Sequence, residues 1–69
     1  MLIEKRIGRR IRQQREAMGL SRSDLADRCG LTRVSVYNTE LGVHSVSVGH
    51  LAAIAKALGT TIAALTETP

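Results

Sequence analysis

Basic side chains are the most numerous charged groups of the sequence, and they are unevenly placed. Nine of the ten lysines and arginines lie at or before Arg33, and six of them fall between Lys5 and Arg15. The formal net charge of the chain is +4. A lopsided basic half predicts an anionic partner, with nucleic acid ahead of an acidic membrane surface.

The other reactive side chains do not combine into a catalytic or metal site. Cys29 is the single cysteine, which excludes an internal disulfide framework and suits a reducing compartment. We expect it to be a small buried core residue. His44 and His50 have no further Cys or His at ligand spacing, so we expect surface histidines and no metal. Because no Ser-His-Asp or paired-carboxylate arrangement can be assembled, the sequence predicts a non-enzyme without a cofactor.

Length and composition predict one small domain. The chain has 69 residues, close to the lower limit for a core that folds alone, and we expect a single domain over 1–69 with a tail from about residue 66. It has no phenylalanine or tryptophan, so the core must be aliphatic and a dimer is expected to add stability. The sequence has no run long enough to span a membrane and no signal peptide, which predicts a cytoplasmic protein.

Four segments show apolar residues at helical spacing. They are residues 3–18, 21–29 and 47–58, and a short helix after Thr61. The apolar stripe of the first consists of Ile3, Ile7, Ile11 and Met18. In the second, Ser21 is a good N-cap and Asp24 completes a weak capping box. The last is expected to bury Ile62 and Leu65.

The stretch GLTRVSVYNTELG, residues 30–42, is compatible with two structures. Its central VSVY alternates and is mostly β-branched or aromatic, as in a strand. A hairpin between residues 33–37 and 44–48 would need poor turn formers at its turn and would leave an isolated two-stranded sheet. A helix has a start signal in Thr32 and a stop signal in Gly42. We therefore predict a helix.

Two opposite charges fall on the inner faces of the predicted helices. Arg15 lies four residues after Ile11, where the first stripe should be apolar. On the helix through residues 30–42, Glu40 turns inward together with Leu31, Val36 and Thr39. Because neither charge is tolerable alone in a core, we predict that Arg15 and Glu40 form a structural ion pair.

A short helix, a tight turn with glycine and a second helix form a helix-turn-helix unit. The pieces "R..RE..GLS", "LA", "CGLT", "VY..E.G" and "L..IAKALG" occur here in one order and spacing. Together they resemble the Xre/Cro/C1-type helix-turn-helix family, the lambda-repressor-like DNA-binding domain, over about residues 3–65. The resemblance implies a compact all-α, five-helix fold in which the second and third helices form the unit.

The resemblance also implies how the domain would bind DNA. The recognition helix, about residues 32–41, would lie in the major groove with its N-terminal end at the base edges. By position in the motif, the candidate readers are Thr32, Arg33, Val34, Tyr37 and Asn38. Arg33 suits guanine and Asn38 suits adenine, whereas Val34 suits only a thymine methyl group. Tyr37 could reach a phosphate or a pyrimidine edge.

Phosphate contacts are expected from outside the recognition helix. The family usually has glutamine where this chain has Arg22, and an arginine at a helix N-terminus suits a phosphate. The weaker candidates are Arg9, Arg10 and Arg12. The family positions that match Arg15 and Glu40 also form an ion pair. Two departures are Thr39, at a position that is usually large and apolar, and Val46, where proline is common.

The sequence thus predicts a regulator of transcription that binds double-stranded DNA by sequence. We expect a repressor, bacterial or phage-encoded, that dimerises on a palindromic operator. The expected dimer contact is the fifth helix with the loop around Val43 and Val46. Two alternatives stay open. One is the DNA-binding antitoxin of a toxin–antitoxin pair; the other is a module that binds a toxin, effector or other protein through Val34, Tyr37 and Leu41.

Overall fold

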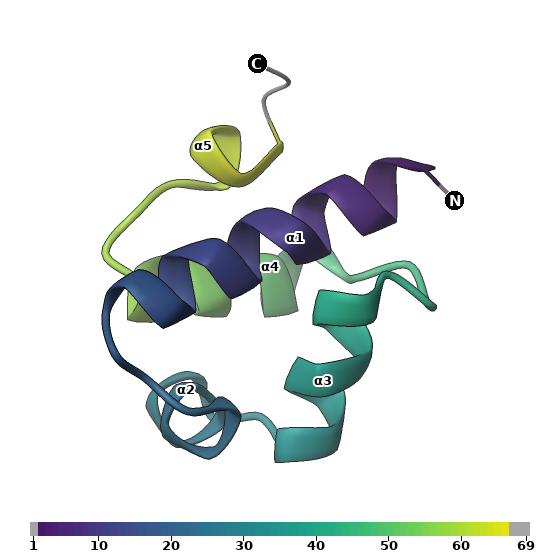
Figure 1. Cartoon of the computed structure of the whole chain (residues 1–69). Helices are drawn as coiled ribbons and strands as arrows, with labels where there is room; N and C mark the ends of the chain where they lie inside the picture. Colours follow the sequence, from purple (N-terminus) through teal and green to yellow (C-terminus); the bar gives the residue numbers. More distant parts are fainter. Residues whose placement is uncertain (1, 67–69) are drawn as a thin grey trace.

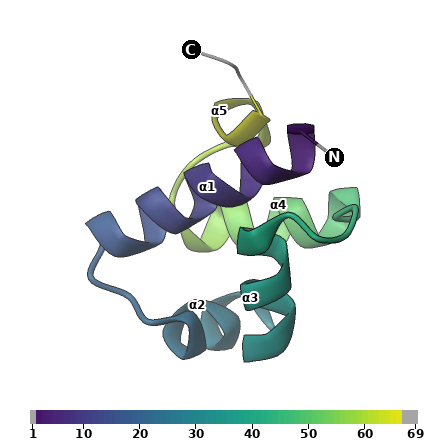
Figure 2. The ribbon, with the colours of Figure 1, turned by 45° about the vertical axis from the view of Figure 1, so that its right-hand side comes forward.

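The computed structural model describes residues 2–66 and contains five helices in this range. They are α1 (Leu2–Ala17), α2 (Arg22–Cys29), α3 (Arg33–Leu41), α4 (Val48–Ala57) and α5 (Ile62–Thr66). The described range contains no strand, so the predicted all-α, five-helix fold is confirmed. In Figures 1 and 2, α1 lies between α5 on one side and the α2–α3 pair on the other, with α4 behind it. Within residues 2–66 no helix is long and apolar enough to cross a membrane.

Side-chain caps fix the ends of α2 and α3. The Ser21 hydroxyl accepts from the N–H of Asp24 at 3.0 Å, and the Asp24 carboxylate accepts from the N–H of Ser21 at 2.9 Å, so the capping box is present. α2 ends at Gly30 with φ 72°, a left-handed conformation that favours glycine. Thr32 then caps α3 by accepting from the N–H of Ser35 at 3.0 Å. The segment predicted to be helical is a helix.

Ten aliphatic residues from all parts of the fold form the core. They are Ile7, Ile11, Leu25, Ala26, Val36, Leu51, Ile54, Ala55, Leu58 and Leu65. The expectation that Ile3 and Met18 extend the stripe of α1 was wrong, because they are 48% and 43% exposed. Ile3 lies in the first turn of α1, and Met18 follows the last helical residue, so both project beyond the packed part of the helix. Cys29 is only partly buried against the core, and this burial raises the pKa of its thiol.

α1 and α3 approach each other at backbone distance. A Cβ atom on Gly8 would lie 2.3 Å from the carbonyl oxygen of Glu40 and 2.5 Å from that of Thr39. Gly42, at the end of α3, has φ 69°, and a Cβ atom there would lie 2.6 Å from Cα of Lys5. Any side chain at either position would force the two helices apart. Two glycines thus set how closely the candidate recognition helix lies on α1.

Gly8→Ala is therefore expected to destabilise the domain, although alanine is the better helix former. We expect the free energy of unfolding to fall by about 3 kcal/mol, near the upper end of the cost of overpacking a core. Gly49→Ala is the matched control, because this helical glycine has only Ser47 Oγ at 4.0 Å from the added Cβ. Its stability should stay equal or rise by up to about 1 kcal/mol. Urea denaturation of both variants tests this, and equal stabilities would contradict the close-packed contact.

Candidate nucleic-acid interface

A buried carboxylate joins α3, the candidate recognition helix, to α1. Glu40 is 8% exposed and Arg15 is 6% exposed. Arg15 Nε donates to Glu40 Oε2 at 2.6 Å, and Arg15 Nη2 donates to Oε1 at 3.2 Å. The remaining Nη1 donates to the carbonyl oxygen of Leu20 at 2.7 Å, in the turn between α1 and α2. The hydrogen bond to Glu40 raises the pKa of Arg15, and the ion pair expected from the sequence is present.

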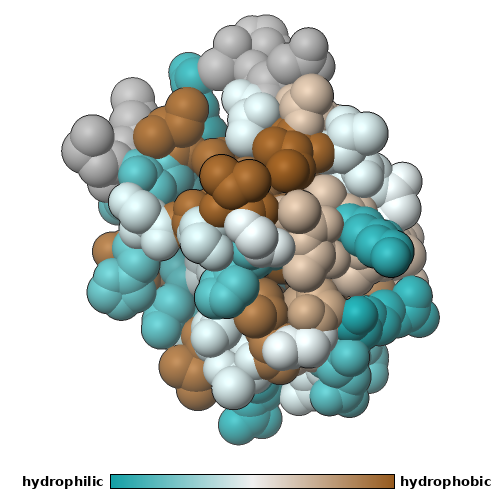
Figure 3. Space-filling model, turned by 180° about the vertical axis from the view of Figure 1, so that it is seen from behind, coloured by the Kyte–Doolittle hydropathy of each residue, from teal (hydrophilic) through white to brown (hydrophobic). Residues whose placement is uncertain are grey.

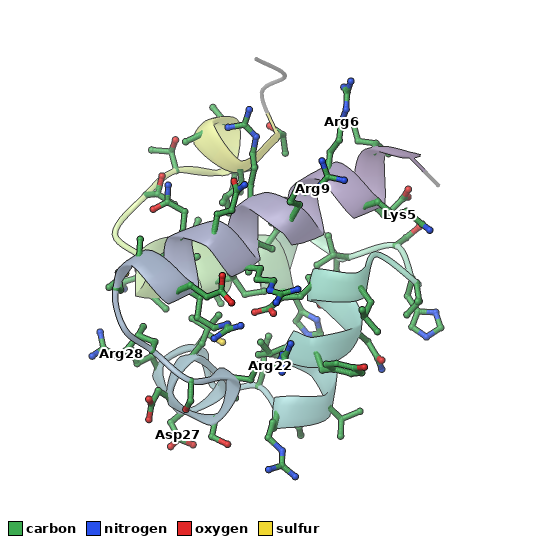
Figure 4. All side chains as sticks on the ribbon, in the orientation of Figure 1. Lys5, Arg6, Arg9, Arg22, Asp27 and Arg28 are labelled. Atoms are coloured by element: carbon green, nitrogen blue, oxygen red, sulfur yellow. The ribbon has the colours of Figure 1, made fainter. Side chains whose placement is uncertain are left out.

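A second guanidinium binds the same carboxylate. Arg22, the first residue of α2, donates from Nε to Glu40 Oε1 at 3.3 Å. Its Cζ atom lies 4.9 Å from the centre of the Tyr37 ring, within the range of a cation–π contact. In Figure 4 the Arg22 side chain reaches from α2 across to α3. Arg22 therefore does more than stand at a helix N-terminus, because it connects the buried pair to an aromatic ring on the outer face of α3.

The N-terminal half of α3 presents an exposed mixed surface. Val34 is 63% exposed and Tyr37 is 44% exposed, while Arg33 is exposed beside them. Together with Arg22 they line an open hollow of about 280 Å³. The structure thus brings four of the predicted site residues together at one place. Guanidinium groups next to apolar and aromatic side chains suit the polar edges and methyl groups of bases in a major groove.

The two other predicted site residues lie differently. Asn38 is half-buried and lines a separate hollow of about 150 Å³ on the side of α3 that faces the loop before α4. The exposed histidines His44 and His50 line the same hollow, which agrees with the prediction that they lie at the surface. The hydroxyl of Thr32 accepts from Ser35 N–H and donates to Ser35 Oγ at 3.0 Å, so it is used in the helix cap.

Free cations gather on the N-terminal half of α1. Lys5, Arg6 and Arg9 are exposed, and no hydrogen bond or ion pair within residues 2–66 holds their side chains (Figure 4). Arg10 instead donates to the carbonyl oxygen of Ala64 in α5 at 3.2 Å, and Arg12 pairs with Glu16 at 3.2 Å. Arg9, Arg10 and Arg12 were the weaker candidates for phosphate contacts. Of these three, only Arg9 has a side chain without a hydrogen bond or ion pair to another group within residues 2–66.

The family of the chain follows from comparison with known proteins. Residues 11–65 match the family model HTH_3, described as a helix-turn-helix, which covers most of the chain. The chain belongs to this helix-turn-helix family. The matched part of this HTH_3 domain includes the Arg15–Glu40 pair, Arg22 and the whole of α3.

A relative and two solved structures are similar to this HTH_3 domain. Over 56 residues, 81% of the chain, it is 39% identical to the uncharacterized HTH-type transcriptional regulator y4wC of Sinorhizobium fredii, and it spans 39% of the length of that protein. The restriction-modification controller protein C.AhdI of Aeromonas hydrophila superposes with a TM-score of 0.90 at 34% identity, covering 94% of this chain and 98% of that one. The clp gene regulator ClgR of Corynebacterium glutamicum superposes with a TM-score of 0.88 at 26% identity, covering 94% of this chain and 69% of that one.

Sequence reasoning missed two features of this HTH_3 domain, and only the second of them carries a signal along a single helix. The contact between Arg22 and Tyr37 joins different helices, and nothing in either helix alone signals it. Gly8 did carry a signal, because a glycine inside a helical segment costs about 1 kcal/mol relative to alanine and therefore indicates a packing reason. The structure supplies that reason in the close approach of α1 to α3.

Glu40→Ala is expected to lower the free energy of unfolding by about 3–5 kcal/mol, because it leaves a buried Arg15 without its partner. Replacing both residues by apolar ones, Arg15→Met with Glu40→Leu, should cost less than Glu40→Ala alone. Glu16→Ala is the control. Its side chain is 54% exposed, it pairs with Arg12 at 3.2 Å and reaches Arg15 only at 3.9 Å, and exposed pairs are worth at most about 1 kcal/mol. Thermal melting checks all three, and a Glu40→Ala protein that melts within about 2 °C of the parent would contradict a buried pair.

Proposed function

We propose that this HTH_3 domain binds double-stranded DNA by sequence and acts as a transcriptional repressor. The observation that carries the proposal is the division of α3 into two faces. Its inner face is fixed by Val36 and Glu40, while its outer face presents Arg33, Val34 and Tyr37 to the exterior. A helix whose N-terminal side chains are exposed in this way is suited to enter a major groove with its first turns at the base edges. The proposed role is binding in the bacterial cytoplasm, without catalysis.

Each residue proposed to contact a base is expected to bind the base that its side chain suits. Arg33 would bind guanine O6 and N7, Asn38 would bind adenine, and Val34 would contact a thymine methyl group. Thr32 serves as the N-cap of α3 and not as a base contact, because its hydroxyl is already used in the cap. Lys5, Arg6, Arg9 and Arg22 supply positive charge for phosphates. Binding should therefore weaken steeply as salt rises, because each neutralised phosphate releases counterions.

A protein partner on the same face is the second candidate function. Val34, Tyr37 and Leu41 are 63%, 44% and 46% exposed along one side of α3, which suits a toxin or another protein as well as DNA. The salt dependence of binding separates the two. An antitoxin would bind both DNA and its toxin, whereas a protein-interaction module would give no saturable binding to any duplex.

The proposed assembly is a symmetric dimer on a palindromic operator. Figure 3, the view from behind, shows apolar side chains gathered over the face that carries α4 and α5. Val43 and Val48 are 54% and 75% exposed, and Ala63 is exposed on α5. Val46 is less exposed because it packs partly buried against the core, and Ala64 is half-buried with its carbonyl oxygen bound by Arg10. The contact therefore centres on Val43, Val48 and Ala63.

Selection of bound sequences from a random pool of duplexes tests DNA binding and its symmetry. We expect an enriched palindrome, in which two half-sites lie about 34–36 Å apart or a multiple of that distance. A pool that shows no enrichment at low salt would contradict the proposed function.

Arg33→Ala should weaken binding to the selected duplex by about 1–3 kcal/mol and relax the preference at one base position, because a bidentate contact to guanine is lost. Arg28→Ala is the matched control. It removes an exposed arginine at the C-terminal end of α2, and Figure 4 shows this side chain pointing away from α3. Fluorescence anisotropy with selected and random duplexes measures both effects. Equal losses for the two variants on both duplexes would show that Arg33 does not read sequence.

Ala63→Glu should abolish cooperative binding to the palindrome while the monomer stays folded. The proposed interface is small, at or below the roughly 1,200 Å² of the weakest stable interfaces, so a single buried charge should disrupt it. Ala17→Glu, at the far end of α1, introduces the same charge at an exposed alanine outside the contact. Sedimentation with and without the duplex measures assembly, and normal dimerisation of the Ala63→Glu protein would place the interface elsewhere.

A further inference from the structure

Two groups of this chain contact the Arg22 guanidinium, the Glu40 carboxylate and the Tyr37 ring. Its Nε donates to Glu40 Oε1 at 3.3 Å, and that same oxygen accepts from Arg15 Nη2 at 3.2 Å. The Glu40 side chain is 2% exposed, whereas that of Arg22 is 36% exposed. The guanidinium plane is therefore tied at its inner edge to a fixed carboxylate, while its outer edge still reaches the surface.

Tyr37 depends on that fixed plane for its position. The ring centre lies 4.9 Å from Arg22 Cζ, and Tyr37 is 44% exposed, so Arg22 supplies a contact to a ring that is partly open to solvent. An exposed ring with no such contact would occupy several rotamers and would have to be ordered on binding. With Arg22 in place, the ring stands beside Val34 and Arg33 at the edge of the same hollow.

We propose that Arg22 is a positioning residue and that Tyr37 is the specificity-determining residue it positions. This inference rests on the proposed DNA-binding function and deepens it. Tyr37 contacts a pyrimidine at the edge of the hollow, next to the base pair bound by Arg33. The outer Nη atoms of Arg22 face a phosphate of the same half-site. The phosphate contact and the base contact are then coupled through one guanidinium, whose inner edge is bound to Glu40.

Substitution of Arg22 by lysine tests this proposal, because it separates the positive charge from the planar guanidinium. Lysine keeps the positive charge and can contact a phosphate, but it has no planar fork to bind Glu40 and stack on a ring at the same time. Because Arg22→Lys keeps the charge, its affinity for random DNA should fall less than that of Arg22→Gln, and its salt slope should stay nearer to that of the parent. It should lose on the order of tenfold in preference at one base position, the usual scale of a single base contact.

Three further variants define the result. Arg22→Gln should lose the same preference and also reduce the salt slope by about one phosphate. Tyr37→Leu should lose preference at the same base position, and Arg22→Lys combined with Tyr37→Leu should lose no more than either change alone. Melting temperatures near that of the parent show that each protein is folded.

The measurements are preference profiles from the random duplex pool and anisotropy titrations at several salt concentrations. A profile of Arg22→Lys that matches the parent at every position would overturn the proposal, as would additive losses for Arg22→Lys and Tyr37→Leu. An even loss of affinity on all sequences would reduce Arg22 to a phosphate contact. Failure of the proposed function itself would look different, because the parent would then enrich no duplex from the pool.

Discussion

One buried carboxylate sets the geometry on which the rest of this domain depends. Glu40 accepts hydrogen bonds from Arg15 of α1 and from Arg22 of α2, so three helices meet at a single charged group. Taking such groups out of water is costly, and a buried ion pair often contributes little net stability compared with apolar packing. What the cluster contributes instead is a fixed arrangement, because α3 can move against α1 or α2 only by separating these charges. The outer face of α3 is thereby held in one orientation.

Close packing of the backbone complements the charged cluster. The core has no phenylalanine or tryptophan, so its volume comes from aliphatic side chains and from helices that lie near each other. Gly8, Ile11 and Arg15 follow one face of α1 at helical spacing. Gly8 meets the backbone of α3, Ile11 is buried in the core, and Arg15 meets α3 through charge. Both ends of the α1–α3 contact are therefore fixed. A binding surface of few residues benefits from such rigidity, because less order has to be acquired when a partner binds.

Much of this arrangement could be predicted from the sequence where local signals agree with the fold. Ser21 with Asp24 and Thr32 marked helix starts, and Gly42 marked a helix end, as the structure shows. The β-branched residues of α3 favoured a strand. The caps favoured a helix, as did the poor turn and the isolated two-stranded sheet that a hairpin would need, and the helix is present. Arg15 and Glu40 were paired by the argument that neither can be buried alone. The exposure of Ile3 and Met18 could not be predicted, because periodicity gives the direction of a side chain and not the length of the surface that covers it. Nor could the stack of Arg22 on Tyr37, which depends on the angle between two helices.

We propose that the outer, N-terminal half of α3 binds DNA while the Glu40 cluster behind it stays in place. Nuclear magnetic resonance of the nitrogen-15-labelled protein, titrated with the duplex selected from the random pool, tests this binding mode. We expect saturable shifts of backbone amides and arginine side chains to concentrate at the start of α2 and over residues 32–38. The Arg15 Nε–H signal should change little, because this group stays bound to Glu40. Shifts concentrated on α4 and α5, or on α1 alone, would show that another face of the domain binds the duplex.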